Sequence, residues 1–178
     1  AETRAALGQL GATCAEVPMT NTSLNPLALL GSLRELRRTL RRIAPDVLIS
    51  YTIKPVIIGT LAARAEKVPR IVALITGAGY AFTPGREPKR LLSRLAASLL
   101  YRRALRHADA VIFQNSDDEA LFRKLGLVGR GQAVHRVNGS GVDLGHYAPA
   151  PLPDQASFLM IARLIKDKGV REFAEAAK

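Results

Sequence analysis

The chain has 178 residues, 48% of them apolar, and its 26 lysines and arginines outnumber 15 acidic residues to give a formal charge of +11. This composition excludes a fibrous or disordered protein, and the single cysteine, Cys14, excludes an internal disulfide framework. The charge favours anionic partners, which include nucleic acid, acidic membranes and phosphate-bearing substrates. No apolar run approaches the roughly 20 residues that span a bilayer, so we expect any membrane contact to be peripheral.

The first residues predict structure rather than a leader sequence. Residues 1–10 predict an amphipathic helix and lack the apolar core of a signal peptide. Because the first residue is not Met, we expect the chain to begin inside a domain.

Strand and helix patterns then alternate along the chain. Short aliphatic or β-branched segments predict strands at residues 13–18, 47–52, 70–75, 110–114 and 133–137. Intervening segments predict helices at residues 26–43, 55–65, 87–106 and 116–125, with helix-start signals at Asn25-Pro26 and at Ser116 with Glu119. The alternation predicts an α/β fold, a parallel sheet with helices on both faces.

Proline-rich residues then indicate a change of domain. Pro149, Pro151 and Pro153 stand among small residues, as is typical of a linker. A new strand is predicted at residues 158–161, followed by a loop and a helix. We therefore expect a first domain over residues 1–148, a linker over 149–157, and the opening strand-loop-helix of a second domain over 158–178.

The stretch LITGAGYAFTPG places Gly77 and Gly79 directly after a predicted strand. A dinucleotide-binding fingerprint is disfavoured, because Phe82 occupies the third glycine position and no acid follows about 20 residues later to hold a ribose. Two interpretations stay open, a plain glycine turn and a substrate loop. The candidate substrate loop consists of Thr76, Gly77, Ala78, Gly79 and Tyr80.

Two predicted helices are rich in cations. In residues 87–106, one helical face holds Leu92, Leu95, Ala96 and Leu99, and the opposite face holds Arg90 and Arg94. Toward its end, Arg102, Arg103 and Arg106 turn back to the apolar side, where they need anionic partners or a helix that has left the sheet. The helix at 26–43 has a similar basic end, formed by Arg34, Arg37, Arg38, Arg41 and Arg42. The alternatives are a solvated face and an anionic membrane surface.

The remaining titratable residues give no catalytic assignment. His107 ends a helix, where we interpret it as a cation at the helix C-terminus, while His135 and His146 carry no signal. The acids at residues 117–119 fall in the first turn of a helix, where they offset the helix dipole. No cluster of Cys and His has zinc-site spacing, so no metal site is predicted.

A second basic loop precedes the last predicted helix. Arg163, Lys166 and Lys168 lie between the predicted strand and Gly169, which stands before the helix. Cations beside a helix N-terminus are suited to phosphate, although basic residues in surface loops are also common.

Three blocks occur in a fixed order: ADAVIFQNSDDEALFRKLGL, NGSGVDLGHYAP and FLMIARLIKDKGVREFAEAAK. Together they resemble the retaining, nucleotide-sugar-dependent glycosyltransferases of family 4, over about residues 46–178. The resemblance implies a GT-B architecture of two Rossmann-like domains, of which this chain would hold a truncated N-terminal domain without its first strand. It implies a nucleoside-diphosphate sugar as donor substrate, with no other cofactor and no required metal.

The resemblance also implies roles for single residues. Arg163 and Lys168 would bind the donor diphosphate, Ser140 and Gly141 would belong to the interdomain loop, and Lys54 would lie on the acceptor side with the substrate loop. Many relatives carry a histidine where this chain has Thr76-Gly77-Ala78-Gly79, so no catalytic residue is assigned. The stretches YTIKPVIIGTLAAR and ITGAGYAFT resemble a subgroup that extends polyprenyl-diphosphate-linked sugars in polysaccharide or glycan assembly.

The expected function is sugar transfer with retention to a lipid-linked acceptor, by an enzyme at the cytoplasmic face of the cell membrane. Its expected partners are a nucleotide sugar, a polyprenyl-diphosphate-linked glycan acceptor and an anionic membrane surface, without nucleic acid; residues 1–178 alone are expected to be inactive. One alternative is a basic α/β module that binds nucleic acid, disfavoured by 5% aromatics and no tryptophan. The other is an NAD-dependent nucleotide-sugar epimerase or dehydrogenase, disfavoured by the incomplete glycine fingerprint.

Overall fold

The computed structural model describes residues 2–17, 26–79, 82, 88–164 and 168–177. Three residues singled out above, Asn25, Tyr80 and Lys166, lie outside these ranges. The chain divides into two compact units, Ala1–Ser140 and Gly141–Lys178. Each unit is described by itself below.

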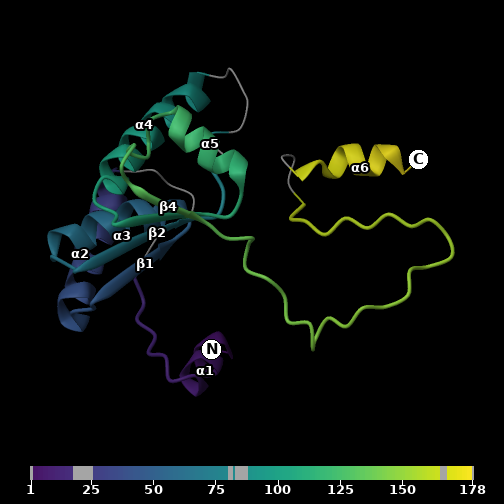
Figure 1. Ribbon diagram of the computed structural model, residues 1–178, viewed down its shortest axis with the longest axis horizontal. Helices are drawn as coiled ribbons and strands as arrows, with labels where there is room; N and C mark the ends of the chain where they lie inside the picture. The colour runs from purple at the N-terminus through teal and green to yellow at the C-terminus, as the bar shows by residue number, and fades with distance from the viewer. Residues whose placement is uncertain (1, 18–25, 80–81, 83–87, 165–167, 178) are drawn as a thin grey trace. The chain divides into compact units, whose positions relative to one another are not determined.

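The larger unit alternates helices and strands (Figure 1). In chain order its elements are α1 (Glu2–Gln9), α2 (Pro26–Ile43), β1 (Val47–Tyr51), α3 (Ile53–Ala65), β2 (Arg70–Ile75), α4 (Pro88–Leu105), β3 (Ala110–Phe113), α5 (Ser116–Lys124) and β4 (Ala133–Arg136). The smaller unit contains α6 (Val170–Ala176). The predicted α/β class and each of these helices are confirmed.

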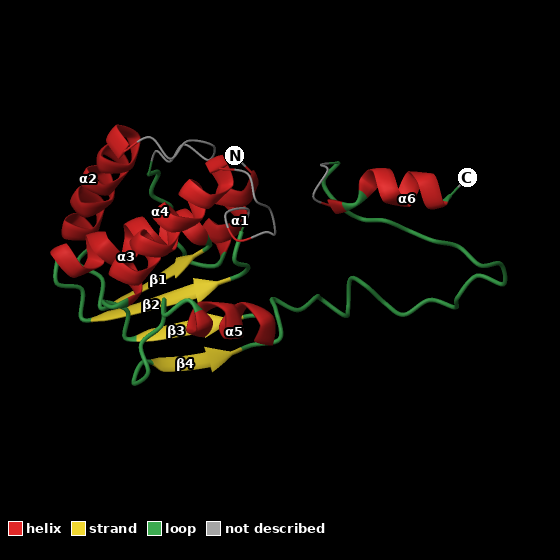
Figure 2. Cartoon of the chain, turned by 90° about the horizontal axis from the view of Figure 1, so that it is seen from above, coloured by secondary structure: helices red, strands yellow, loops and turns green. Residues whose placement is uncertain are grey.

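The four strands form one parallel sheet in the order β1-β2-β3-β4. In the register, Ser50 pairs with Ala73 and Ala73 with Val111, so these side chains share one face of the sheet. All three are buried, and residues of α3, α4 and α5 belong to the core that covers this face. Figure 2 shows these helices over the strands.

Among the described residues, the helices that follow β1, β2 and β3 all contribute to the core on one face of the sheet. The second face carries Val47, Ile49 and Tyr51, which are 51%, 65% and 49% exposed. The strand order explains the difference, because right-handed crossovers that always step in one direction put every connecting helix on the same side. Covering both faces requires the strand order to reverse, and no reversal occurs among the described strands.

Two predicted strands are absent from the described residues. Residues 13–17 and 158–162 have no regular secondary structure, and their side chains are almost all exposed. A strand requires a hydrogen-bonded neighbour, and an apolar sequence alone does not supply one. Both segments have the composition of a strand, but neither has a pairing partner in the structure.

An aromatic cluster occupies the centre of the core. The ring of Phe122, from α5, lies 5.0 Å from the ring of Tyr101, 5.3 Å from that of Phe113 and 5.9 Å from that of Phe82. Phe113, Tyr101 and Phe122 are fully buried. The cluster therefore fastens α4 and α5 to the end of β3.

Helix α4 presents a different face to the core than the leucine spacing suggested. Its buried residues are Ala97, Tyr101, Ala104 and Leu105. The predicted apolar face is exposed: Leu92, Leu95 and Leu99 are between 57% and 68% accessible, and Ala96 is exposed as well. Ala97, Tyr101, Ala104 and Leu105 thus pack into the core, and the leucines of the predicted apolar face point away from it.

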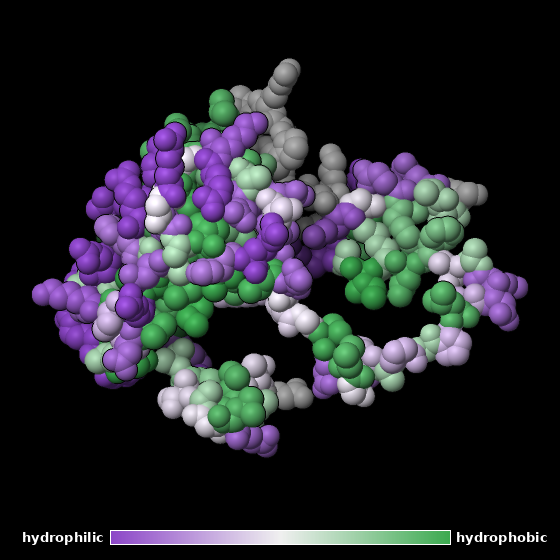
Figure 3. Space-filling model, viewed as in Figure 1, coloured by the Kyte–Doolittle hydropathy of each residue, from purple (hydrophilic) through white to green (hydrophobic). Residues whose placement is uncertain are grey.

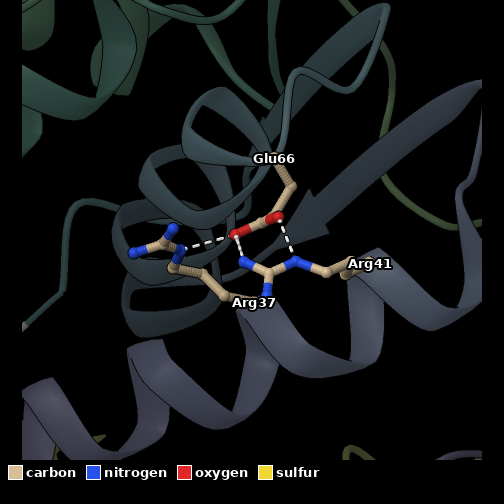
Figure 4. A network of polar contacts seen from close by, with 3 residues as sticks. All are labelled: Arg37, Arg41 and Glu66. Atoms are coloured by element: carbon tan, nitrogen blue, oxygen red, sulfur yellow. Dashed lines mark hydrogen bonds and ion pairs between the residues drawn. The ribbon is translucent and has the colours of Figure 1, made fainter.

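An ion-pair network joins α2 to the end of α3 (Figure 4). Arg37 Nε donates to Glu66 Oε1 at 2.6 Å, while Arg41 donates to both carboxylate oxygens, at 2.9 and 3.0 Å. The hydrogen bonds from Arg41 and then Arg37 lower the pKa of Glu66 to about 2. Arg37 and Arg41, which the sequence suggested for a membrane surface, therefore form ion pairs within the fold.

This network predicts a pH-dependent contribution to stability. A carboxyl group whose pKa falls on folding stabilises the fold above its ordinary pKa of 4.5, and this contribution is lost as the pH falls toward about 2. We expect Glu66→Gln to flatten the dependence of the unfolding midpoint on pH across that window. Glu35→Gln, which removes the exposed pair with Arg38, is the matched control and should leave the slope unchanged. Equal slopes for wild type and Glu66→Gln would contradict the role of the network.

Candidate functional site

The candidate site lies at the carboxyl edge of the sheet. Because all four strands are parallel, the segments that follow them emerge along one edge, where open α/β sheets bind ligands. These segments contain Thr52 and Lys54 after β1, residues 76–79 after β2, Gln114 and Asn115 after β3, and residues 137–140 after β4. Residues 76–79 of the predicted substrate loop, Lys54 and Ser140 thus lie along the same edge, with Lys54 after one outer strand and Ser140 after the other.

Thr52 has a backbone conformation that is unusual for a residue with a side chain. Its φ is +71° and its ψ is 169°, a region populated almost entirely by glycine. Two hydrogen bonds stabilise this strained conformation. The Thr52 N–H donates to Leu74 O at 3.3 Å, and the Thr52 carbonyl accepts from Val56 N at 2.9 Å. The turn directs the chain from β1 straight into α3 and places Lys54 in the first turn of that helix.

The substrate loop is packed against the start of α3. Gly79 has a φ of +80°, and a β-carbon there would collide with the δ-carbon of Ile53. Glycine is favoured at position 79 mainly by its positive φ, because the δ-carbon at the end of the Ile53 side chain could move aside for a β-carbon. Gly77, by contrast, has open space around it, so a β-carbon would meet no atom there.

Asp118 ties this loop to α5. Its Oδ1 accepts a hydrogen bond from the Ala78 N–H at 3.1 Å, and its Oδ2 accepts from the Asn115 amide at 2.7 Å. The sequence placed Asp118 among acids that offset the helix dipole, and its contact with a loop 40 residues earlier was missed. No local signal indicates such a contact.

The cap of α5 lies one residue earlier than predicted. Asn115 is the N-cap, and its side-chain oxygen accepts from the Asp118 N–H at 2.8 Å. The expected pairing of Ser116 with Glu119 is wrong, since Glu119 instead accepts from Arg123. The signal was present in the sequence, because asparagine is among the strongest N-cap residues.

Tyr101 belongs to the aromatic cluster in the core. Burial raises the pKa of its hydroxyl, and the negative charge of Asp118 raises it further. Among the described residues its hydroxyl has no hydrogen-bond partner. Tyr101 therefore stays neutral and acts as a packing residue rather than as a base.

After β4, the chain leaves the sheet through glycine-rich residues. Gln114 Nε2 donates to Ser140 Oγ at 3.5 Å, and Val137 N donates to Phe113 O at 2.9 Å, so this exit runs beside the end of β3. Gly139 and Gly141 have φ values of +79° and +73°. Gly141 is the first residue of the smaller unit.

The smaller unit carries Arg163 and Lys168, both exposed. Gly169 precedes α6, where the sequence predicted the helix start, and its φ of +71° is left-handed. The phosphate-binding role of the two cations stays a prediction.

Other titratable groups have structural explanations. Partial burial, followed by the charges of Arg64, Arg103 and Arg106, lowers the pKa of His107, which argues against the predicted cation at that helix end. Arg102 donates to the carbonyls of Leu125 and Gly126, at 2.9 and 3.2 Å, so its partners are a helix end rather than the expected anions. In the described parts of the chain, no group of three His, Cys, Asp or Glu residues is arranged to hold a metal.

This geometry defines a Rossmann-like α/β domain with a candidate site at the carboxyl edge of its parallel sheet. Residues 1–139 match the family described as "Glycosyl transferase 4-like domain". The match covers most of the chain, which therefore belongs to this family of glycosyltransferases. The resemblance inferred from the sequence is thereby confirmed at the level of the family.

A curated relative gives a more specific comparison. The chain is 28% identical, over 185 aligned residues, to the N,N'-diacetylbacillosaminyl-diphospho-undecaprenol alpha-1,3-N-acetylgalactosaminyltransferase of Campylobacter jejuni subsp. jejuni serotype O:2. The alignment covers 96% of this chain and 48% of the relative. The chain thus spans about half the length of the relative it matches.

Proposed function

We propose that the protein transfers a sugar from a nucleoside-diphosphate donor to a polyprenyl-diphosphate-linked glycan acceptor, with retention of the anomeric configuration. The family match and the relative's diphospho-undecaprenol acceptor support this proposal. The larger unit would form the acceptor side, where Lys54 and the substrate loop meet at one sheet edge.

The donor side would begin in the smaller unit. We propose that residues 158–178 open a donor-binding domain in which Arg163 and Lys168 contact the diphosphate, and that Ser140 and Gly141 lie in the connection to it. In the reaction, the bond between the sugar and the diphosphate breaks, and negative charge develops on the leaving diphosphate. Two cations placed beside it stabilise that charge most in the transition state, which lowers the barrier.

Product analysis tests the proposed function. The full-length protein would be incubated with a panel of nucleotide sugars and polyprenyl-diphosphate-linked acceptors, and products would be identified by mass spectrometry. We expect one donor and acceptor pair to give a lipid-linked product heavier by one sugar. Cofactor-dependent oxidation or epimerisation of the nucleotide sugar, without transfer, would refute the proposal.

We also propose peripheral attachment to an anionic membrane, at its cytoplasmic face. Exposed Leu95 and Leu99 share α4 with exposed Arg103, and Arg106 follows in the turn after this helix. Figure 3 shows hydrophobic and hydrophilic side chains interspersed on the visible surface of the chain. Each well-placed cation contributes about 1 kcal/mol at an anionic surface. None of the described helices is long and apolar enough to cross a membrane.

Vesicle co-sedimentation checks this attachment. We expect binding to rise with anionic lipid content and to fall with salt, since screening acts within a Debye length of about 8 Å at physiological ionic strength. Replacing both Arg103 and Arg106 by Glu should weaken binding strongly. Replacing exposed Lys124, at the end of α5, and exposed Arg130 by Glu makes the same charge change elsewhere and should weaken binding less. Equal binding to neutral and anionic vesicles would exclude an electrostatic attachment.

A further inference from the structure

An apolar groove opens between α2, α3 and α4. Its volume is about 270 Å³, and it is lined by leucine and isoleucine side chains from α2 and α3 together with Ala97 and Leu100 of α4. Among the described residues that line it, Lys54 is the one charged side chain. The described side chains that line the groove are therefore apolar, with Lys54 as the one cation among them.

The groove reaches the candidate site. Ile53 lines it and also packs against Gly79 of the substrate loop. Lys54 lines it as well, in the first turn of α3, which begins directly after the strained turn at Thr52. The charged part of the groove thus lies at the carboxyl edge of the sheet, where the acceptor is proposed to react.

We propose that this groove binds the isoprenoid units nearest to the diphosphate of the acceptor lipid. An isoprenoid diphosphate is complementary to the groove. Its apolar chain matches the apolar lining, and its anionic head group matches the charge of Lys54. With the chain between α2 and α3, the diphosphate would lie beside Lys54, and the glycan would point to the substrate loop. The volume suits a short stretch of chain, so the rest of the lipid would stay in the membrane. This inference rests on the proposed function, because it assigns the lipid of the same acceptor.

The arrangement explains how a lipid-linked acceptor could be selected by more than its sugars. Leu30, which is 46% exposed, and Leu33 contribute to the α2 side, while Ile57 and Leu61 contribute to the α3 side. Burial of branched isoprenoid carbons against these side chains stabilises the complex in proportion to the apolar area removed from water. A cation close to the head group adds preference for a diphosphate over a neutral alcohol.

Photo-crosslinking tests the groove without requiring sugar transfer. The probe is farnesyl diphosphate with a diazirine on its terminal isoprene unit, added to the full-length protein, and labelled peptides are mapped by mass spectrometry. We expect labels within residues 29–33 and 53–61. Unlabelled farnesyl diphosphate should compete, whereas inorganic diphosphate and farnesol should compete at least about tenfold more weakly, a ratio that corresponds to one decade in Kd.

A variant pair on α2 completes the test. Leu30→Asp places a charge in the groove wall and should reduce labelling about tenfold or more, whereas Ile43→Asp changes an exposed residue outside the groove and should leave labelling intact. Labelling confined to other segments, equal competition by a diacyl phospholipid, or unchanged labelling of a folded Leu30→Asp protein would each overturn the inference. If sugar transfer to lipid-linked acceptors occurs without labelling of the groove, the inference fails and the proposed function stands. Groove labelling without any sugar transfer supports the groove and refutes the proposed function.

Discussion

Arg163→Ala and Lys168→Ala in the full-length enzyme should each lower kcat/KM by an amount equivalent to about 2–4 kcal/mol of transition-state stabilisation. Both cations precede α6 in a block whose order and spacing resemble the donor loop of the family. If each contacts the leaving diphosphate, its removal leaves developing charge uncompensated, and kcat should fall more than KM rises.

Steady-state kinetics with a saturating acceptor and varied nucleotide sugar measure this effect. Arg171→Ala is the matched control, since Arg171 is an exposed cation within α6 to which no donor contact is assigned. It should retain most of the activity. Near-normal kcat/KM in both the Arg163 and Lys168 variants would remove the donor assignment.

A second large effect is expected for stability. Phe122→Ala should lower the free energy of unfolding by about 3–5 kcal/mol, because Phe122 is fully buried and its ring contacts three other aromatic rings. The cavity would lie where α5 is attached to α4 and β3, so the site at the sheet edge should loosen with it. Denaturant unfolding of the full chain measures the change.

Tyr101→Phe is the control in the same cluster. It keeps the ring and removes a buried hydroxyl that has no partner among the described residues, so stability should stay unchanged or rise slightly. A loss of less than about 1 kcal/mol for Phe122→Ala would show that the cluster is less well packed than its ring distances indicate.

Local patterns predicted the elements well. The bounds of α2 agree with the prediction at both ends, and β1 to β4 agree within one residue, because periodicity and capping act within a few residues along the chain. The glycines that follow β2 were visible in the same way, whereas Lys54 was singled out through the family resemblance.

Features that depend on distant pairing were not predictable. Apolar residues 158–161 have the composition of a strand but no neighbour with which to pair. The exposure of Ile49 on the second face of the sheet depends on strand order. The hydrogen bond between Asp118 and Ala78 depends on packing between segments 40 residues apart. The strained turn at Thr52 could not be expected either, because a threonine there carries no signal for a positive φ.

The consecutive strand order also bears on how the larger unit folds. Each strand pairs with the strand nearest in sequence, so every pairing spans one helical crossover, as Val47 with Arg70 does. A parallel pairing of this kind is non-local and slow to form, but limiting each crossover to one helix keeps the loop-closure entropy lost at each step small. During synthesis, β2, β3 and β4 can each add to the free edge left by the strand before it. None of these four described strands has to insert between two that are already paired.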